Sequence, residues 1–176
     1  VSVITSTGFG TADFNLWPSY SRTLLLILMI VGACAGSTGG GMKVARLVIM
    51  TKAAFGEIRH QLFPRSVARH SLDGERLDNA VIRNTLAYCT LYALIAMLSV
   101  ILLSTEGRDF DTTLSSVISC MSNIGPGLGL VGPTGNYSVF GPGGKLLLSL
   151  CMILGRLEIF PVVMLIAPDV WVGRKK

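Results

Sequence analysis

Charged residues divide this chain into long apolar stretches and shorter polar segments. Residues 84–105 are 22 consecutive residues without a charge, enough at about 1.5 Å rise per residue to cross about 30 Å of hydrocarbon. Residues 23–35 are apolar as well, and so is the stretch from Lys145 to Pro168 after the lysine, except for Arg156 and Glu158. This pattern predicts one complete membrane helix at 84–105, a second at 145–168, and the first half of another at 23–35.

The segment between the predicted helices at 84–105 and 145–168 has a different pattern. Residues 112–144 contain no charge, yet the second half is rich in glycine and proline. Because glycine costs a helix interior about 1 kcal/mol and proline about 3 kcal/mol, the segment is not helical throughout. We expect a short helix from Thr112 to Met121, a Gly/Pro turn and an extended return. Such irregular backbone is tolerated at membrane depth where protein or a water-filled cavity receives it, so this is a candidate re-entrant pore loop.

Composition supports a membrane protein. Of the 176 residues, 51% are hydrophobic and 14% are charged, whereas soluble domains are roughly a quarter charged. The four cysteines lie singly in apolar stretches without Cys-x-x-Cys spacing, so we expect neither a metal site nor another cofactor. The chain begins with Val1 inside an apolar, glycine-rich motif, from which we expect it to be a piece of a longer protein.

The positive charges indicate topology. The segment 43–83 has a net charge of +4, because four acidic residues oppose eight basic ones: Lys43, Arg46, Lys52, Arg59, Arg65, Arg69, Arg76 and Arg83. The loop 106–111 has a net charge of −2. Basic loops remain in the cytoplasm, so we expect the 57–80 connector and the C-terminus to be cytoplasmic and the Gly/Pro loop to enter from outside. Basic residues placed beside membrane spans do not indicate a nucleic-acid partner.

Two turns repeat at an offset of 117 residues. The chain opens with a Ser/Thr-rich segment that leads into Gly8-Phe9-Gly10, and a second one leads into Gly125-Pro126-Gly127. Glycines let successive carbonyls point toward one axis, and this arrangement suits a dehydrated cation. A short helix that enters the membrane also points its negative C-terminal end at that position. A single such turn is most often an ordinary loop, but two copies in matching positions predict carbonyl-lined turns that coordinate a cation.

The glycine-rich segment 36–41 has three interpretations. A phosphate-binding loop needs lysine directly after the last glycine, but Met42 stands there and Val44 follows Lys43, so this interpretation fails. Helix packing is a second, because Gly32, Gly36 and Gly40 share one helical face at four-residue spacing. The third is a functional break in the helix, which three consecutive glycines favour.

Four strings in order resemble the Trk/Ktr/HKT superfamily, and most closely its bacterial TrkH branch. They are Thr7-Gly8-Phe9-Gly10, the string from Gly36 to Lys43, Ser122 to Gly127, and Gly155 to Phe160. The resemblance covers essentially the whole chain. It implies an all-α membrane protein with four M1–pore-helix–M2 repeats, whose re-entrant filter loops surround a central pore. Residues 1–56 would form the end of repeat three and residues 81–176 would form repeat four. Residues 57–80 would connect these two repeats in the cytoplasm.

The resemblance also implies the site residues. The potassium-binding filter would use Ser6, Thr7, Gly8, Phe9 and Gly10 in one quadrant, and Asn123, Ile124, Gly125, Pro126 and Gly127 in another. A movable gate would consist of Gly36, Ser37, Thr38, Gly39, Gly40 and Gly41. Arg156 would face the pore as a barrier to cations, with a structural ion pair as the alternative, because ionisable groups at membrane depth usually face a cavity or a partner.

We therefore expect a non-enzymatic, pore-forming subunit for potassium uptake in the bacterial inner membrane. By resemblance its partners are repeats one and two of the same subunit, a second subunit in a homodimer, and a cytosolic nucleotide-binding regulatory protein. The alternative is a multipass membrane enzyme or a non-channel transporter whose glycines serve helix packing. No paired Asp or Ser/His constellation lies in the predicted spans, which counts against the enzyme.

Overall fold

The computed structural model describes residues 1–34, 36–37, 39–63, 71–72, 75–76 and 78–157. Their elements, in chain order, are η1 (Phe14–Leu16), α1 (Ser19–Val31), α2 (Val44–Leu62), β1 (Ser71–Leu72), β2 (Glu75–Arg76), α3 (Asn79–Ser104), α4 (Phe110–Ser122), η2 (Gly129–Val131), η3 (Tyr137–Val139) and α5 (Pro142–Leu157). Apart from the two-residue strands of an antiparallel hairpin, the described part is helical with irregular connections. The helices α3, α4 and α5 follow the predicted order of membrane helix, short re-entrant helix and membrane helix.

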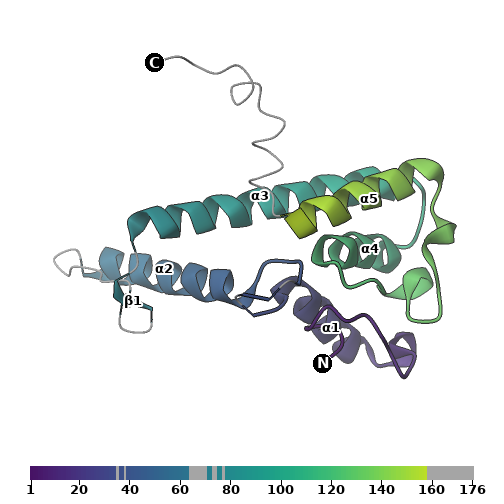
Figure 1. The fold of residues 1–176 in the computed structure, drawn as a ribbon, viewed down its shortest axis with the longest axis horizontal. Coiled ribbons are helices and arrows are strands. Elements are labelled where there is room, and N and C mark those ends of the chain that lie inside the picture. The colour runs from purple at the N-terminus through teal and green to yellow at the C-terminus, as the bar shows by residue number, and fades with distance from the viewer. Residues whose placement is uncertain (35, 38, 64–70, 73–74, 77, 158–176) are drawn as a thin grey trace, which may run out of the picture.

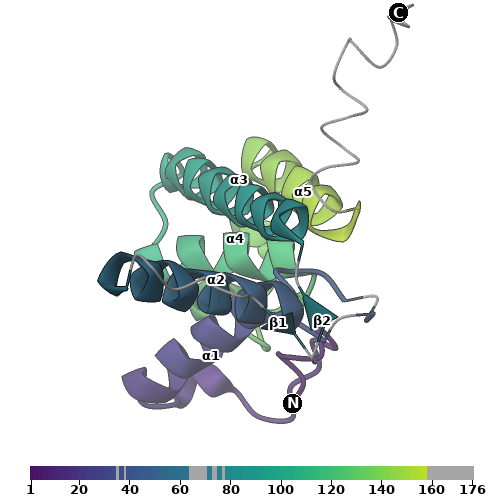
Figure 2. The same cartoon turned by 90° about the vertical axis from the view of Figure 1, so that its left-hand side faces the viewer.

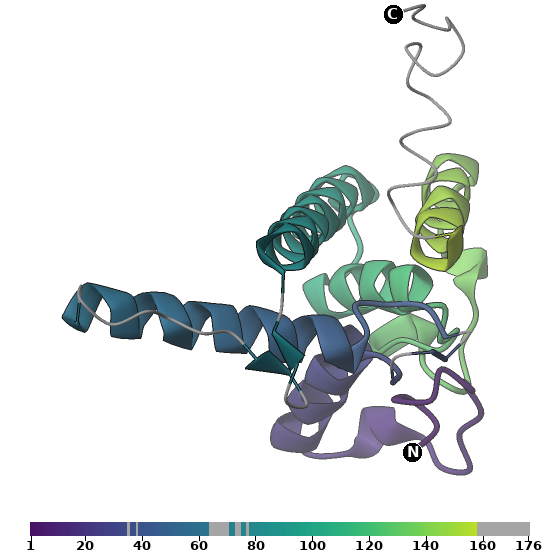
Figure 3. The same cartoon turned by 60° about the vertical axis from the view of Figure 1, so that its left-hand side comes forward.

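The short helix α4 lies in the middle of the fold. Figure 1 shows α3 and α5 on one side of it and α1 on the other, and α4 contacts all three. Figure 2 shows the same succession of layers from the end of the molecule. The helix α2 contacts α3 and extends away from the other helices (Figure 3). The 13-residue helix α4 is thus enclosed by the longer helices α3 and α5 and by α1, which has the same length.

The polar and apolar side chains are arranged for a lipid environment. In the described part of the chain, α3 is the one helix long and apolar enough to cross a membrane. It exposes large apolar side chains, among them Leu94, Leu98 and Ile101. By contrast, six serines and threonines of α4 are buried: Thr112, Thr113, Ser115, Ser116, Ser119 and Ser122. Small hydroxyl residues are typical of helix contacts inside membranes, where water does not compete for their hydrogen bonds.

The N-terminus of α5 is capped by a residue from another part of the fold. Glu106, just beyond α3, accepts hydrogen bonds from the N–H groups of Gly141 (2.9 Å) and Gly144 (3.0 Å). The first N–H groups of a helix have no partner within it, and a carboxylate there also opposes the positive end of the helix dipole. A Cβ on Gly144 would overlap the Glu106 carboxylate, so glycine at this position permits the cap.

The first helix ends earlier than the sequence pattern indicates. We expected helix from Thr23 to Ala35, but α1 ends at Val31, because Gly32 adopts a φ of +69°. Gly32, Gly36 and Gly40 therefore lie in a connection between α1 and α2 and not on one helical face. The helix-packing interpretation of these glycines is wrong. Of the predicted 145–168 helix, the part after Leu157 lies outside the described residues, with Glu158.

Glu106→Gln should destabilise the fold, because the neutral amide replaces a charged double acceptor at the start of α5. We expect a loss of about 1 kcal/mol, the usual effect of removing a helix cap. The measurement is the thermal unfolding midpoint of the purified full-length subunit in detergent. Glu57→Gln, at an exposed position on α2, is the matched control and should leave the midpoint unchanged. Equal midpoints for the two variants would contradict the assigned cap.

Candidate functional site

The helix α4 places its C-terminus in the interior of the fold. All residues from Thr112 to Ser122 except the half-buried Leu114 are buried. The helix ends at Asn123, which adopts left-handed backbone angles (φ 53°, ψ 41°). At the opposite end, Asp111 forms an ion pair with Arg22 of α1 at 2.7 Å. The last carbonyls of a helix carry a partial negative charge, so the buried end of α4 is suited to a cation.

Three hydroxyls along α4 hold the chain segment that returns from this end. They belong to residues at i, i+3 and i+7 of one helical face, and they contact every second residue of the returning segment. Thr112 Oγ1 accepts from Leu130 N (3.2 Å), Ser115 Oγ accepts from Leu128 N (2.8 Å), and Ser119 Oγ donates to the carbonyl of Pro126 (2.9 Å). The helix thereby fixes the path of the backbone that follows the second glycine turn.

The two glycine turns share positive φ values at equivalent positions. Ser6 and Asn123, 117 residues apart, have φ values of 54° and 53°, and Gly8 and Gly125 have values of 79° and 109°. Non-glycine residues rarely adopt positive φ, so its occurrence at both Ser6 and Asn123 is a specific feature.

The hydrogen bonds of the turns repeat at the same offset. Ser6 N donates to Val3 O (3.2 Å) as Asn123 N donates to Cys120 O (3.1 Å). Thr7 N donates to Ser2 O as Ile124 N donates to Ser119 O, at 3.0 Å in each pair. The repeat found in the sequence is thus also present in the backbone hydrogen bonds. In both turns, the first N–H groups donate to carbonyls three and five residues earlier in the chain.

The two turns lie against each other. A Cβ on Gly8 would overlap the carbonyl oxygen of Ile124 and would come within 3.3 Å of Pro126 Cδ. Only glycine, which has no Cβ and tolerates a φ of 79°, allows this approach. The structure therefore brings the centres of the two predicted quadrants together.

The carbonyls of the second turn fall into two pairs. Gly125 O accepts from Tyr137 Oη (2.6 Å), and Pro126 O accepts from Ser119 Oγ. Within the described residues, the carbonyls of Asn123 and Ile124 accept no hydrogen bond. Pro126 also lacks an N–H, which removes one donor from the turn. Adjacent carbonyls that accept no hydrogen bond from the described residues, next to the negative end of α4, are available to a partly dehydrated cation.

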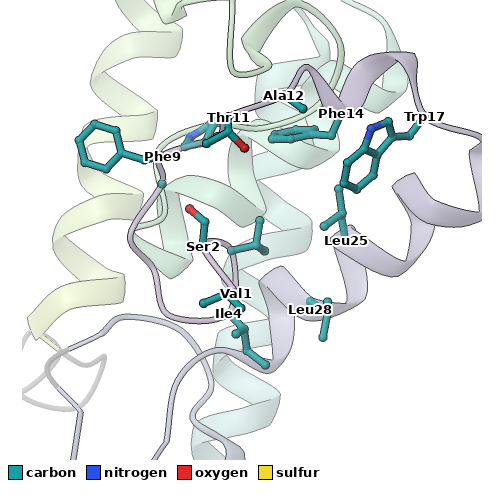
Figure 4. Close-up of a pocket in the computed structure, with 14 residues that line it drawn as sticks. Val1, Ser2, Ile4, Phe9, Thr11, Ala12, Phe14, Trp17, Leu25 and Leu28 are labelled. Atoms are coloured by element: carbon teal, nitrogen blue, oxygen red, sulfur yellow. The ribbon is translucent and has the colours of Figure 1, made fainter.

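The outer residues of the predicted filter have other surroundings. Phe9 is 83% exposed, and its ring projects away from the other residues that line a pocket of about 250 Å³ between the first turn and α1 (Figure 4). Gly10 is exposed near Pro133, whereas Gly127 is buried against Val131 and Ser115. The structure therefore brings Gly8 against Ile124 and Pro126, whereas Phe9, Gly10 and Gly127 have the separate surroundings just described.

The predicted gate lies directly beside both turns. A Cβ on Gly39 would be 3.4 Å from Ser6 Oγ, and a Cβ on Gly40 would be 2.8 Å from the Ser122 carbonyl oxygen and 2.9 Å from Asn123 Nδ2. Gly41 approaches the Ser122 side chain in the same way. The backbone of this loop thus covers the end of α4 at contact distance.

The remaining gate residues are placed less tightly. Ser37 Oγ accepts from Gly39 N at 3.1 Å, and a Cβ on Gly36 would meet nothing within 4 Å. Thr38 lies outside the described residues.

The helix α5 approaches the same helix end from the other side. A Cβ on Gly155 would overlap the carbonyl oxygen of Met121, and Asn123 Nδ2 donates to Met152 O at 3.1 Å. Arg156, the next residue, is exposed. The predicted barrier residue is therefore adjacent to the point where α5 contacts the buried end of α4.

Several of these contributors were absent from the sequence-based site. The helix-compatible apolar residues of 112–121 predict the helix but not the role of its hydroxyls. Neither Tyr137 nor Gly155 belongs to the predicted filter, gate or barrier, although Gly155 begins the string from Gly155 to Phe160. The spacing of Thr112, Ser115 and Ser119 on one helical face was the available signal for the hydroxyls. The described residues contain no group of three or more His, Cys, Asp or Glu side chains that could hold a metal ion.

Comparisons with known proteins agree with this structure. A family model described as TrkH, cation transport protein, matches residues 1–171. The Trk system potassium uptake protein TrkH of Escherichia coli K12 is 33% identical over 171 residues, which are 97% of this chain and 35% of that protein. The Trk system potassium uptake protein TrkI of Halomonas elongata is 33% identical over 172 residues, with the same two coverages.

A solved structure is also similar. The crystal structure of the potassium transporter TrkH from Vibrio parahaemolyticus superposes with a TM-score of 0.87 at 35% identity, over 97% of this chain and 36% of that chain. The chain spans about 35% of the length of these curated relatives. The expected resemblance to the TrkH branch is confirmed: this chain belongs to the TrkH family of cation transport proteins.

Proposed function

We propose that this chain forms part of the wall of a potassium-uptake pore in a longer membrane subunit. The observation that carries the proposal is the meeting of two turns with matching positive φ values at the buried end of α4, where the Asn123 and Ile124 carbonyls accept no hydrogen bond within the described residues. The names of the relatives, which are potassium uptake proteins, favour potassium as the ion. They also favour transport over a membrane enzyme.

Ion passage needs no covalent chemistry in this mechanism. Backbone carbonyls replace part of the hydration shell of a cation, and the C-terminal end of α4 adds a negative potential at the same position. The carbonyls of Ser6 and Thr7 serve one quadrant, and those of Asn123 and Ile124 serve the next. The hydroxyls that bind the returning segment keep these carbonyls in place while ions enter and leave.

The loop 36–41 is the proposed gate, and its position against both turns supports this role. Closed, its backbone lies across the end of α4, and movement away from Ser122 and Asn123 clears the path below the turns. Arg156 adds a positive charge near the same path, which raises the energy of a passing cation.

The rest of the assembly follows the family. Repeats one and two, in the longer subunit, would complete the ring, and residues 57–80 would connect repeats three and four on the cytoplasmic side. The proposal also includes a second subunit, so that the whole is a homodimer in the bacterial inner membrane with a cytoplasmic C-terminus. A cytosolic nucleotide-binding protein would regulate it. The net charge of +4 over residues 43–83 supports this orientation.

Gly8→Ala tests the filter. The added Cβ would overlap the Ile124 carbonyl and force the turn away from a φ of 79°. The potassium flux through the full-length subunit in liposomes should therefore fall by a factor of about ten or more. The measurement is flux of K⁺, Rb⁺ and Na⁺ along imposed gradients.

Gly143→Ala is the matched control, because a Cβ there meets nothing within 4 Å. A wild-type subunit that carries none of the three ions would overturn the proposed function.

Gly40→Ala tests the gate. A Cβ at 2.8 Å from the Ser122 carbonyl pushes the loop off the end of α4, so flux through the full-length subunit should rise about two- to ten-fold, the change produced by a shift of about 1 kcal/mol in the gate equilibrium. Gly143→Ala again serves as the control. Flux equal to that of the wild type, with the variant inserted and folded, would contradict a gate at this loop.

Arg156→Ala tests the barrier. Removal of one positive charge close to a hydrated ion path lowers the barrier by about 1 kcal/mol, so single-channel conductance or liposome flux should rise about five-fold. Arg83→Ala, at an exposed position in the first turns of α3, is the control for loss of a positive charge elsewhere. If the two variants transport alike, Arg156 has only a structural role.

A further inference from the structure

The two glycine turns are held in place by different forces. The backbone at Gly8 is fixed by packing, because a Cβ there would overlap the Ile124 carbonyl. At Gly125, the equivalent position of the second turn, a Cβ would meet nothing within 4 Å, and the residue is exposed. Close packing at the α-carbon therefore does not hold Gly125 as it holds Gly8, which leaves a role for another interaction at its peptide group.

The hydroxyl of Tyr137 supplies that interaction. Tyr137 Oη donates to Gly125 O at 2.6 Å, a short hydrogen bond for a neutral donor and acceptor. A cavity of about 250 Å³ adjoins both residues, between the turn and α5, and Lys145 and Met152 contribute to its lining. It provides space for the peptide to rotate if the bond is absent. Glycine, with no side chain to hinder it, has the conformational freedom to do so.

Tyr137 is itself held on several sides. Asn136 Oδ1 accepts from Ser138 N at 3.0 Å and caps the short helix η3. At the other end of η3, Arg108 Nη2 donates to Val139 O, and the buried Phe140 ring lies 6.3 Å from that of Tyr137. These contacts hold η3, and with it the Tyr137 side chain, in a defined position next to Gly125.

We propose that Tyr137 is a positioning residue for ion selectivity: its hydroxyl sets the direction of the Gly125 carbonyl and, across the Gly125 Cα, restrains the preceding peptide, which carries the Ile124 carbonyl. The inference rests on the proposed function of the two turns as ion-binding elements. Tyr137 acts on the turn through its hydrogen bond to Gly125 O and is not proposed to bind the cation itself. The residue acts on the spacing of the carbonyls that bind the ion, and this spacing decides which dehydrated ion fits best.

Tyr137→Phe removes the hydroxyl and keeps the ring. In the full-length subunit in liposomes, we expect the ratio of K⁺ to Na⁺ flux to move toward unity by about three- to ten-fold, the factor that corresponds to one ordinary hydrogen bond. Tyr20→Phe is the matched control, because Tyr20 is 79% exposed and lies in the first turn of α1. The thermal unfolding midpoint of each variant in detergent separates a selectivity effect from a general loss of structure.

The outcomes distinguish this inference from the proposed function. A changed flux ratio in Tyr137→Phe, with the unfolding midpoint and the Tyr20→Phe ratio as in the wild type, supports it. An unchanged ratio, in a wild-type subunit that does conduct, overturns the role of Tyr137 and leaves the ion-binding turns intact. A change that appears equally in Tyr20→Phe also overturns it. If the wild-type subunit conducts no monovalent cation, it is the underlying function that fails.

Discussion

The structure depends on how closely other backbone segments approach the C-terminal end of α4. The Gly155 backbone comes against Met121 O, and the Gly40 backbone against the Ser122 carbonyl, at distances that exclude a Cβ. Ser122 Oγ in turn donates to Met29 O at 2.7 Å, which ties the end of α1 to the same point. Close contact between backbones is a main source of stability inside a membrane, where burial of apolar side chains contributes little. The same contact puts the glycine loop and α5 next to the carbonyls of the turns.

The elements and their order were predictable because the membrane imposes strong patterns on a sequence. The uncharged stretch 84–105 corresponds to α3, at Asn79–Ser104, and the expected short helix at 112–121 corresponds to α4, at Phe110–Ser122. The offset of the two turns is reproduced in φ values and hydrogen bonds. These features depend on local composition and on repetition along the chain, both of which are visible in a single sequence.

What remained hidden depends on contacts between distant segments. Hydropathy does not indicate that α1 ends at Val31, because that end depends on a positive φ at Gly32, where the chain turns toward the end of α4. The bond from Tyr137 to Gly125 spans 12 residues of irregular backbone, for which no periodicity exists. The capping of α5 by Glu106 joins residues up to 38 apart. In each case the partner is determined by the fold and not by the neighbouring residues.

The repeated turns have a consequence for how such a site changes over time. In a ring made from identical subunits, one substitution appears in every copy and alters all positions together. Here Gly8 and Gly125 occupy equivalent positions on one chain, so a substitution at one leaves the other as it was. The position of Gly8 is set by contact with the Ile124 carbonyl, whereas the Gly125 carbonyl accepts from the Tyr137 hydroxyl, so the two equivalent positions depend on different neighbours. A single substitution on this chain therefore changes one of these two sets of contacts directly, whereas in a ring of identical subunits it would change every copy.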